Sequence, residues 1–143
     1  MRFLDEMVTY LLDSNVVLEL LRNRVEAVTW LNGISPDSEI FISGWTIIEF
    51  MKEKNSKQEM TDVQSKLQQY QIAWPRPENC NEVPIILINH FHSQRDKDKK
   101  LKGSAIYDTL IYVTAKSYGL TLVTMDTDFN FVKDIPLKTL NST

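Results

Sequence analysis

The chain has 143 residues, of which 43% are hydrophobic and 24% are charged, and its formal net charge is −3. This balance is typical of a soluble globular protein with one compact core. No apolar run approaches the roughly 20 residues of a membrane-spanning helix, so the sequence argues against a membrane protein. The net negative charge gives no whole-molecule attraction to nucleic acid, so contact with a polyanion needs a local basic patch.

The cysteine content and the start of the chain indicate the compartment. Cys80 is the only cysteine and cannot form an internal disulfide. The N-terminal stretch MRFLDEM carries two acids where a signal peptide needs a long apolar segment. We therefore expect a single domain over residues 1–143 in a reducing cytoplasm.

Short apolar runs alternate with amphipathic segments in the first half of the chain. The run VTYLL at 8–12 predicts a strand, and VVLELLRN at 16–23 predicts a helix that Asn15 is expected to cap. A second helix is expected over 25–31, ending near Gly33. The stretch EIFIS at 39–43 predicts another strand, and the residues at 45–55 predict a helix.

The second half continues this alternation. A polar helix is expected over 58–70, a brief extended segment at 71–75, and a helix over 83–92 with Asn81 as its candidate cap and Pro84 in its first turn. After a charged stretch at 95–102 we expect a helix over 104–119 that ends at Gly119, then strands at 120–124 and around 137–140. Strands that alternate with helices predict a three-layer α/β/α sandwich with a mostly parallel central sheet.

Four acidic residues are embedded in apolar sequence, whereas most of the 19 Asp and Glu residues lie in solvated stretches. The four are Asp13, Glu49, Asp108 and Asp126. Ligands of parallel α/β sheets bind beside the carboxyl ends of the strands, where Asp13 and Asp126 are expected. Glu49 and Asp108 are expected in about the first turn of two helices, from which both can reach the same crevice.

A crevice that holds four carboxylates needs positive charge. At about 5 Å and an effective dielectric near 20, each pair of like charges costs roughly 3 kcal/mol. Oxygen ligands of this kind suit Mg²⁺ or Mn²⁺, so we expect a divalent metal. Such a metal suggests phosphoryl chemistry, and the chain lacks a GxxxxGK[ST] phosphate loop, which favours phosphodiester hydrolysis.

The stretches that carry the four acids resemble those of the PIN domain family, in particular its VapC-type toxin ribonucleases. They are, in order, YLLDSN, ISGWTIIEF, YDTLIYVTAKSYGLTLVT and TMDTDF. The resemblance implies a PIN-like fold, a Mg²⁺-dependent endoribonuclease acting on RNA, an antitoxin protein as partner, and a homodimer. It also implies catalytic metal ligands at Asp13, Glu49, Asp108 and Asp126, with supporting polar groups at Asn15, Ser43 and Thr124.

Family toxins usually begin only a few residues before the first acid, and Met7 would give that start here. Residues 1–6 are therefore either an N-terminal extension or an addition of the gene model.

Other candidate residues each have a structural alternative. Asp128 either binds the metal through water or caps the turn before Phe129. Trp45 either stacks on an RNA base or belongs to the core. Residues 95–102 form either a solvated loop or an RNA-backbone contact, through Arg95, Lys97, Lys99, Lys100 and Lys102.

Two other functions stay open from the sequence. A catalytically silent PIN-like module would bind RNA or a protein without cutting. A haloacid dehalogenase-type phosphatase is suggested by MDTD after an apolar strand, although that motif normally opens its domain and here lies near the end of the chain. Metal-dependent cleavage of RNA separates these readings.

Overall fold

The computed structural model describes residues 8–95, 97–126, 129, 131, 132 and 134–140. Among these residues, five strands form one sheet in the order β3-β2-β1-β4-β5, and each neighbouring pair is parallel. The strands are β1 (Thr9–Leu12), β2 (Glu39–Ser43), β3 (Gln71–Ala73), β4 (Thr121–Thr124) and β5 (Leu137–Thr139). The predicted parallel sheet is confirmed. Residues 1–6, which were predicted to be an N-terminal extension or an addition of the gene model, lie outside the described residues.

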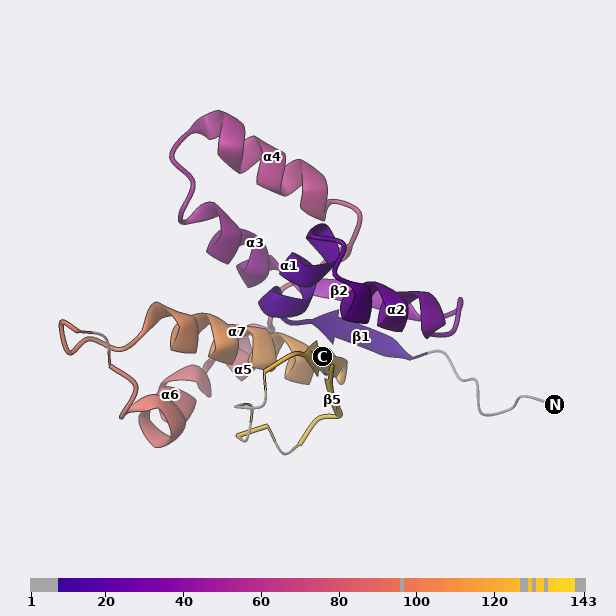
Figure 1. Ribbon diagram of the computed structural model, residues 1–143. Coiled ribbons are helices and arrows are strands. Elements are labelled where there is room, and N and C mark those ends of the chain that lie inside the picture. The colour runs from indigo at the N-terminus through magenta and orange to yellow at the C-terminus, as the bar shows by residue number, and fades with distance from the viewer. Residues whose placement is uncertain (1–7, 96, 127–128, 130, 133, 141–143) are drawn as a thin grey trace.

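Helices cover both faces of the sheet (Figure 1). One face carries α1 (Ser14–Leu21), α2 (Val25–Gly33), α3 (Gly44–Met51) and α4 (Lys57–Leu67); the other carries α5 (Pro77–Cys80), α6 (Val83–Phe91) and α7 (Gly103–Tyr118). Successive strand residues point to opposite faces, so Leu11 and Leu122 pack with α6 and α7, while Leu12 and Val123 pack with α1 and α4. The predicted three-layer sandwich is confirmed.

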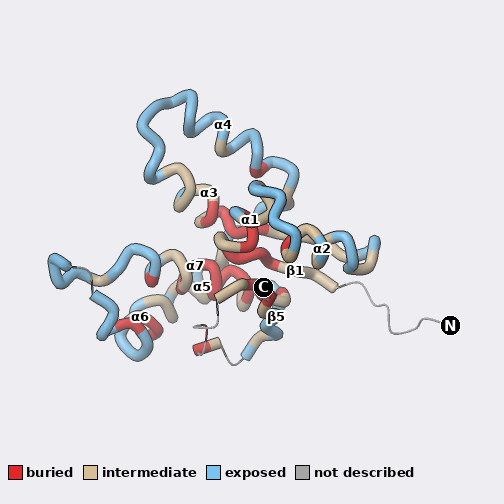
Figure 2. The backbone as a smooth tube through the Cα atoms, in the orientation of Figure 1, coloured by how far each residue is buried: buried red, intermediate tan, exposed pale blue. Residues whose placement is uncertain are grey.

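The core is concentrated where β1 and β4 meet their covering helices. Figure 2 shows buried residues in β1 and in the parts of α1, α3 and α7 that face the sheet, while α4 and the loop before α7 are mostly exposed. Leu67 is the only buried residue among those of α4. The strand ends that carry the first and fourth acids are therefore held by the best-packed part of the molecule.

Two predicted helix caps are wrong. The N-cap of α1 is Asp13, whose carboxylate accepts the backbone N–H of Ser14, and Asn15 lies inside the first turn. An aspartate directly after a strand satisfies a free helix amide, so the helix begins two residues earlier than predicted. Asn81 is instead the C-cap of the short helix α5, and the N-cap of α6 is Glu82, which makes no side-chain cap hydrogen bond.

The remaining elements agree with the sequence apart from their bounds. The helix α3 ends at Met51, earlier than the predicted residue 55, and the one-turn helix α5 was not predicted. Pro84 lies in the first turn of α6, and Gly119 ends α7 with a φ of 64°, both as predicted. In the described part of the chain, no helix is both long enough and apolar enough to cross a bilayer.

Candidate active site

Asp13 and Thr124 lie side by side at the carboxyl ends of the neighbouring strands β1 and β4. The backbone N–H of Asp13 donates to the carbonyl of Val123 at 2.8 Å. The Asp13 residue is 2% exposed; its Oδ2 accepts the Thr124 hydroxyl at 2.7 Å, and its Oδ1 accepts the Ser14 N–H at 2.8 Å. The Thr124 hydroxyl oxygen also accepts the N–H of Asp126 at 3.0 Å. One threonine therefore positions both the Asp13 carboxylate and the segment that carries Asp126.

Glu49 and Asp108 come from the second turns of α3 and α7, one turn later than predicted. The Ser14 hydroxyl donates to Glu49 Oε1 at 2.5 Å and lies 3.5 Å from the hydroxyl of the buried Thr46. Ser14 therefore connects the Asp13 segment to Glu49, across the gap between α1 and α3.

Burial and mutual repulsion change the acidity of this group of carboxylates. Burial, together with the charges of Glu49 and Asp126, raises the pKa of Asp13 to about 6, although the hydrogen bonds from Thr124 and Ser14 act to lower it. Burial, followed by the charges of Asp13, Glu49 and Asp126, raises the pKa of Asp108 to about 8. Each of the other three acids acts on Asp108, so the four predicted residues share one electrostatic environment.

Asp108 differs from Asp13 in its partners. Within the described part of the chain, it makes no hydrogen bond and no ion pair, and only repulsive charges act on it. A carboxylate in this position is either protonated or compensated by a cation that is not part of the described chain.

The four carboxylates fit a divalent metal by their chemistry. Within the described residues, no group of three or more His, Cys, Asp or Glu side chains is arranged to hold a metal ion. The hydroxyl groups of Thr124 and Ser14 donate to the Asp13 and Glu49 carboxylates in this arrangement. Carboxylate oxygens under mutual repulsion are nevertheless the donors that hard cations such as Mg²⁺ and Mn²⁺ prefer. Asp13, Glu49, Asp108 and Asp126 would hold the ion, which would supply a Lewis acid for a phosphate group. The fifth predicted ligand, Asp128, lies outside the described residues.

The predicted supporting residues have different positions. Thr124 contacts Asp13 directly, and Asn15 Oδ1 accepts the N–H of Met125 at 3.2 Å, which ties α1 to the segment after β4. Ser43 is the N-cap of α3 and shares a hydrogen bond of 2.9 Å with Thr114, and no described bond joins it to the acids.

Sequence reasoning missed Ser14 and Thr46. Thr46 lies three residues before Glu49 on α3, so both face the same side of that helix, and Ser14 directly follows the first acid. These spacings were the available signals.

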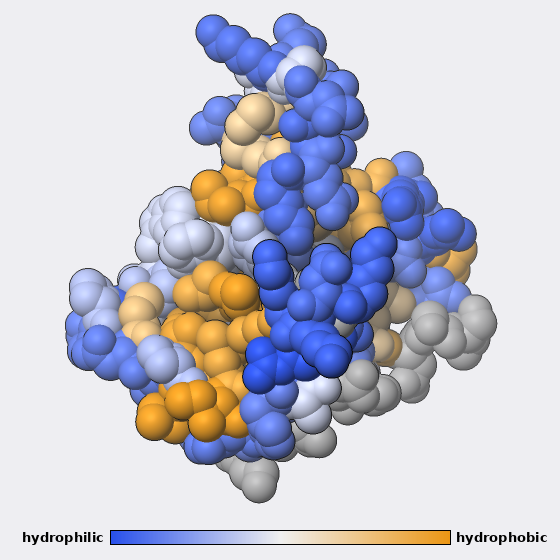
Figure 3. Space-filling model, turned by 90° about the vertical axis from the view of Figure 1, so that its left-hand side faces the viewer, coloured by the Kyte–Doolittle hydropathy of each residue, from blue (hydrophilic) through white to orange (hydrophobic). Residues whose placement is uncertain are grey.

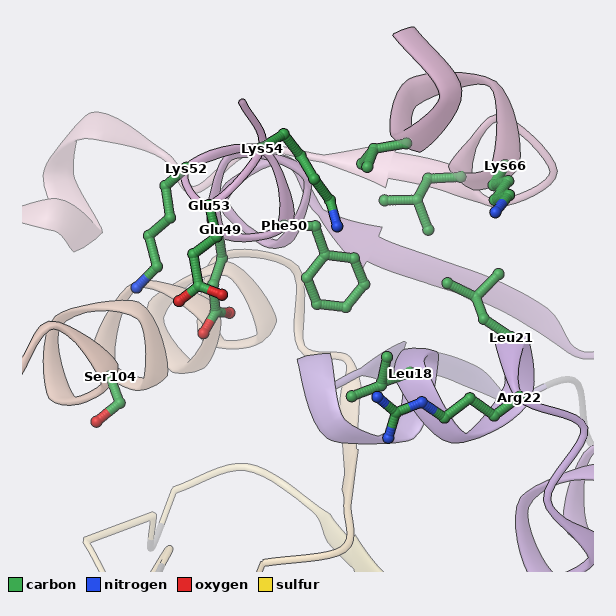
Figure 4. A pocket seen from close by; sticks show the side chains of 12 residues that line it. Leu18, Leu21, Arg22, Glu49, Phe50, Lys52, Glu53, Lys54, Lys66 and Ser104 are labelled. Carbon is green, nitrogen blue, oxygen red and sulfur yellow. The ribbon is translucent and has the colours of Figure 1, made fainter. Parts of the chain in front are cut away.

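A groove of about 650 Å³ borders Glu49, between α1, α3 and α4 (Figure 4). Its apolar wall includes Leu18, Phe50 and Leu67. Its basic side chains come from the end of α1, from the turn after α3 and from α4: Arg22, Lys52, Lys54 and Lys66. The sequence did not indicate this basic groove, because its cations are far apart in the chain and alternate with acids.

A second pocket, of about 310 Å³, borders Asp108 and Asp126 and shares Ser104 with the groove. The basic loop 95–102 starts and ends beside it. An antiparallel bridge joins Arg95 to Leu101, and Lys102 lines the pocket. The side chains of Arg95, Lys97, Lys99 and Lys100 are exposed.

Trp45 lies away from both of these pockets. It is half-buried and makes an edge-to-face contact with Trp74, with ring centroids 5.9 Å apart. Trp45 lines neither pocket, and its role in base stacking stays a prediction.

A parallel α/β domain with clustered carboxylates beside the ends of its strands is the architecture of a candidate phosphodiester hydrolase. The family model described as PIN domain matches residues 10–134, so the chain belongs to the PIN domain family. This confirms the predicted family, supports a nuclease-type hydrolase and replaces the haloacid dehalogenase alternative. No curated protein matches the sequence.

Several solved structures share this fold. VapBC-1 from nontypeable Haemophilus influenzae is 19% identical, with 92% of this chain and 98% of that chain covered and a TM-score of 0.66. VapBC2 from Rickettsia felis, bound to a DNA fragment from their promoter, is 19% identical, with 94% and 100% covered and a TM-score of 0.66. A toxin–antitoxin complex from Klebsiella pneumoniae is 22% identical, with 88% and 94% covered and a TM-score of 0.60.

Proposed function

We propose that this protein is a metal-dependent endoribonuclease that consists of a single PIN domain and acts as the toxin of a toxin–antitoxin pair. The observation that carries the proposal is Asp108, whose pKa is raised to about 8 by burial and by three neighbouring acids. A group of carboxylates that repel one another at the ends of parallel strands destabilises the metal-free fold. It becomes favourable when a divalent cation binds there.

In this proposal, Asp13, Glu49, Asp108 and Asp126 hold Mg²⁺ or Mn²⁺, with Asp128 as a further ligand. The chain's own hydroxyl groups keep the ligands in place before the ion binds. Thr124 donates to Asp13, and Ser14 donates to Glu49. This preorganisation reduces the cost of bringing negative charges together.

The two pockets give a path for an RNA strand across the acids. The groove borders Glu49, the second pocket borders Asp108 and Asp126, and Ser104 lines both. Basic side chains lie on each side of the acids, in the groove and at Lys102. Cations at such positions neutralise phosphates that flank the scissile one, so the chain binds RNA locally in spite of its net negative charge.

We extend the proposal to an antitoxin partner, since the Klebsiella pneumoniae structure with this fold is a toxin–antitoxin complex. As a toxin that cuts cellular RNA, the protein would be held inactive by such a partner until it is released. The cytoplasm, where RNA substrates occur, stays the predicted location.

The proposed homodimer is supported by exposed apolar side chains on α6. Ile85 and Ile88 are 59% and 62% exposed, and Figure 3 shows hydrophobic surface gathered beside a strongly hydrophilic ridge on this side of the molecule. Apolar surface of this kind is typically covered by a partner. Light scattering on the purified protein measures the mass, with Met60→Asp, an exposed α4 position, as the control for Ile88→Asp.

The test of the proposed function is cleavage of a mixed set of structured and single-stranded RNAs by the purified chain. Reactions contain Mg²⁺, Mn²⁺ or EDTA, and a DNA set of the same sequences runs in parallel. The wild type should cut RNA internally only with metal, and the Asp13→Asn, Asp108→Asn double variant should not cut. Asp62→Asn, on the exposed face of α4, is the matched control and should cut normally. If the double variant cuts as the wild type does, the cleavage comes from a contaminant and not from these acids, and the catalytically silent module becomes the better account.

A further inference from the structure

The pocket beside Asp108 and Asp126 has a composition that metal binding does not require. Besides the two acids, it is bounded by aromatic side chains and by neutral and basic polar side chains. Its volume of about 310 Å³ lies at the lower end of the range for small-molecule sites, which is about 300–1,000 Å³. A space of this size is suited to one flat ring system and not to a base pair.

The floor of the pocket is a packed group of phenyl rings. Phe91, Phe129 and Phe131 are 5%, 3% and 8% exposed. The ring of Phe131 lies 5.2 Å from that of Phe91 and 5.5 Å from that of Phe129, measured between centroids. The Tyr112 ring, 5.4 Å away, supports Phe131 from α7. A packed aromatic floor offers apolar contact to the face or edge of a base.

The rim of the pocket is set by the ends of the basic loop. The backbone N–H of Gln94 donates to the carbonyl of Phe91 at 2.9 Å, and its carbonyl accepts the N–H of Lys102 at 3.3 Å. The main chain of Gln94 is therefore fixed on both sides. Its side chain lines the pocket and, within the described residues, makes no hydrogen bond of its own.

A carboxamide presents both a donor and an acceptor, which is the pattern needed to distinguish the edges of nucleobases. Lys102, on the same rim, provides a charge for an adjacent phosphate. Sequence-selective proteins read RNA in this way, through single-stranded bases that rest on aromatic side chains and form hydrogen bonds along their edges.

We infer that this pocket is a base-specific subsite, in which one unpaired base next to the scissile phosphate rests on the Phe floor and is read by Gln94. The inference rests on the proposed ribonuclease function and adds to it the pocket and the side chain that select one base beside the cut. Gln94 is then a specificity residue, and it takes no part in holding the metal.

The experiment measures kcat/KM on short single-stranded RNAs in which each position flanking the cut carries each of the four bases in turn. For the wild type, we expect one position where the best and worst bases differ by about tenfold or more. Gln94→Ala should reduce this difference to about threefold or less, through slower cleavage of the best substrate, while the worst substrate is cut at nearly the wild-type rate.

Three further arms exclude a merely structural effect. Gln94→Glu, which offers acceptors only, should change which base is preferred. Gln64→Ala, at an exposed position on α4, should keep the wild-type preference. An abasic nucleotide at the selective position should be cut by the wild type no faster than the worst base.

The outcomes separate this inference from the proposed function. If the wild type cuts RNA without base preference, or if Gln94→Ala keeps the full preference, the subsite is refuted and the ribonuclease stands. If the wild type cuts no RNA with either metal, the proposed function is refuted, and the subsite with it.

Discussion

Replacement of Asp108 by Asn should stabilise the metal-free protein at pH 8. The pKa of Asp108 is raised from 3.8 to about 8, first by burial and then by the charges of Asp13, Glu49 and Asp126. At a pH between the unfolded and the folded pKa, the folded state keeps a proton that the unfolded state has released, so the stability of the fold decreases as the pH rises. The asparagine has no proton to lose and removes this contribution.

The size of the effect follows from the shift. About four pKa units at 1.36 kcal/mol per unit give an upper limit of about 5 kcal/mol at pH 8. Asp108 is partly exposed, and water and relaxation screen its charge, so we expect about 1–3 kcal/mol. Asp13, with a pKa raised to about 6, also makes the stability decrease as the pH rises, but only up to about pH 6. The variant keeps Asp13, so this part of the pH dependence remains.

The assay is urea unfolding in EDTA at pH 5 and pH 8, for the wild type, Asp108→Asn and the control Asp62→Asn. The wild type and the control should lose stability between these pH values, and Asp108→Asn should lose less. Added Mg²⁺ should stabilise the wild type at pH 8 more than it stabilises Asp108→Asn, because a ligand that binds only the folded state stabilises it by mass action. Equal pH dependence of the wild type and Asp108→Asn would show that the pKa of this carboxyl is not raised in the folded protein, and the reasoning would fail.

Three other predictions concern separate parts of the molecule. Thr124→Val should destabilise the fold by about 1–3 kcal/mol in urea unfolding and abolish cleavage, because the Asp13 carboxylate loses its hydroxyl donor. Thr124→Ser keeps a hydroxyl donor and should retain the stability and the cleavage activity of the wild type. Lys116→Met should cost about 0.5–1 kcal/mol, since the ammonium bonds Glu82 and Asp134, and the loss should shrink in 1 M salt; a salt-independent loss would contradict the ion-pair account. Ile88→Asp should convert the proposed dimer to a monomer in light scattering, and an unchanged mass would place the interface elsewhere.

The sequence allowed the four acids to be predicted because each of them breaks a local rule. Asp13 and Asp126 follow apolar strand runs, and parallel strands bring their carboxyl ends to one edge of the sheet. Glu49 and Asp108 interrupt the apolar faces of helices, where an unpaired charge is costly. Such signals lie within a few residues of each acid, so they can be read without coordinates.

Features that depend on contacts between distant segments could not be predicted in the same way. The basic groove combines cations from the end of α1, from the turn after α3 and from α4, and each of these cations has the pattern of a solvated residue in its own stretch of sequence. Ser14 reaches Glu49 across 35 positions in the chain. The N-cap of α1 is Asp13 and not the predicted Asn15; the two residue types have nearly equal propensities for this position, so the sequence alone does not decide between them.

The most direct test of the central claim is the binding of Mn²⁺ to the purified chain, followed by electron paramagnetic resonance, which detects the free ion. The account predicts that the wild type and Asp62→Asn bind Mn²⁺, that Mg²⁺ competes for the site, and that the Asp13→Asn, Asp108→Asn double variant, folded by circular dichroism, does not bind. Equal binding by the double variant and the wild type would contradict the claim that these four carboxylates form the metal centre.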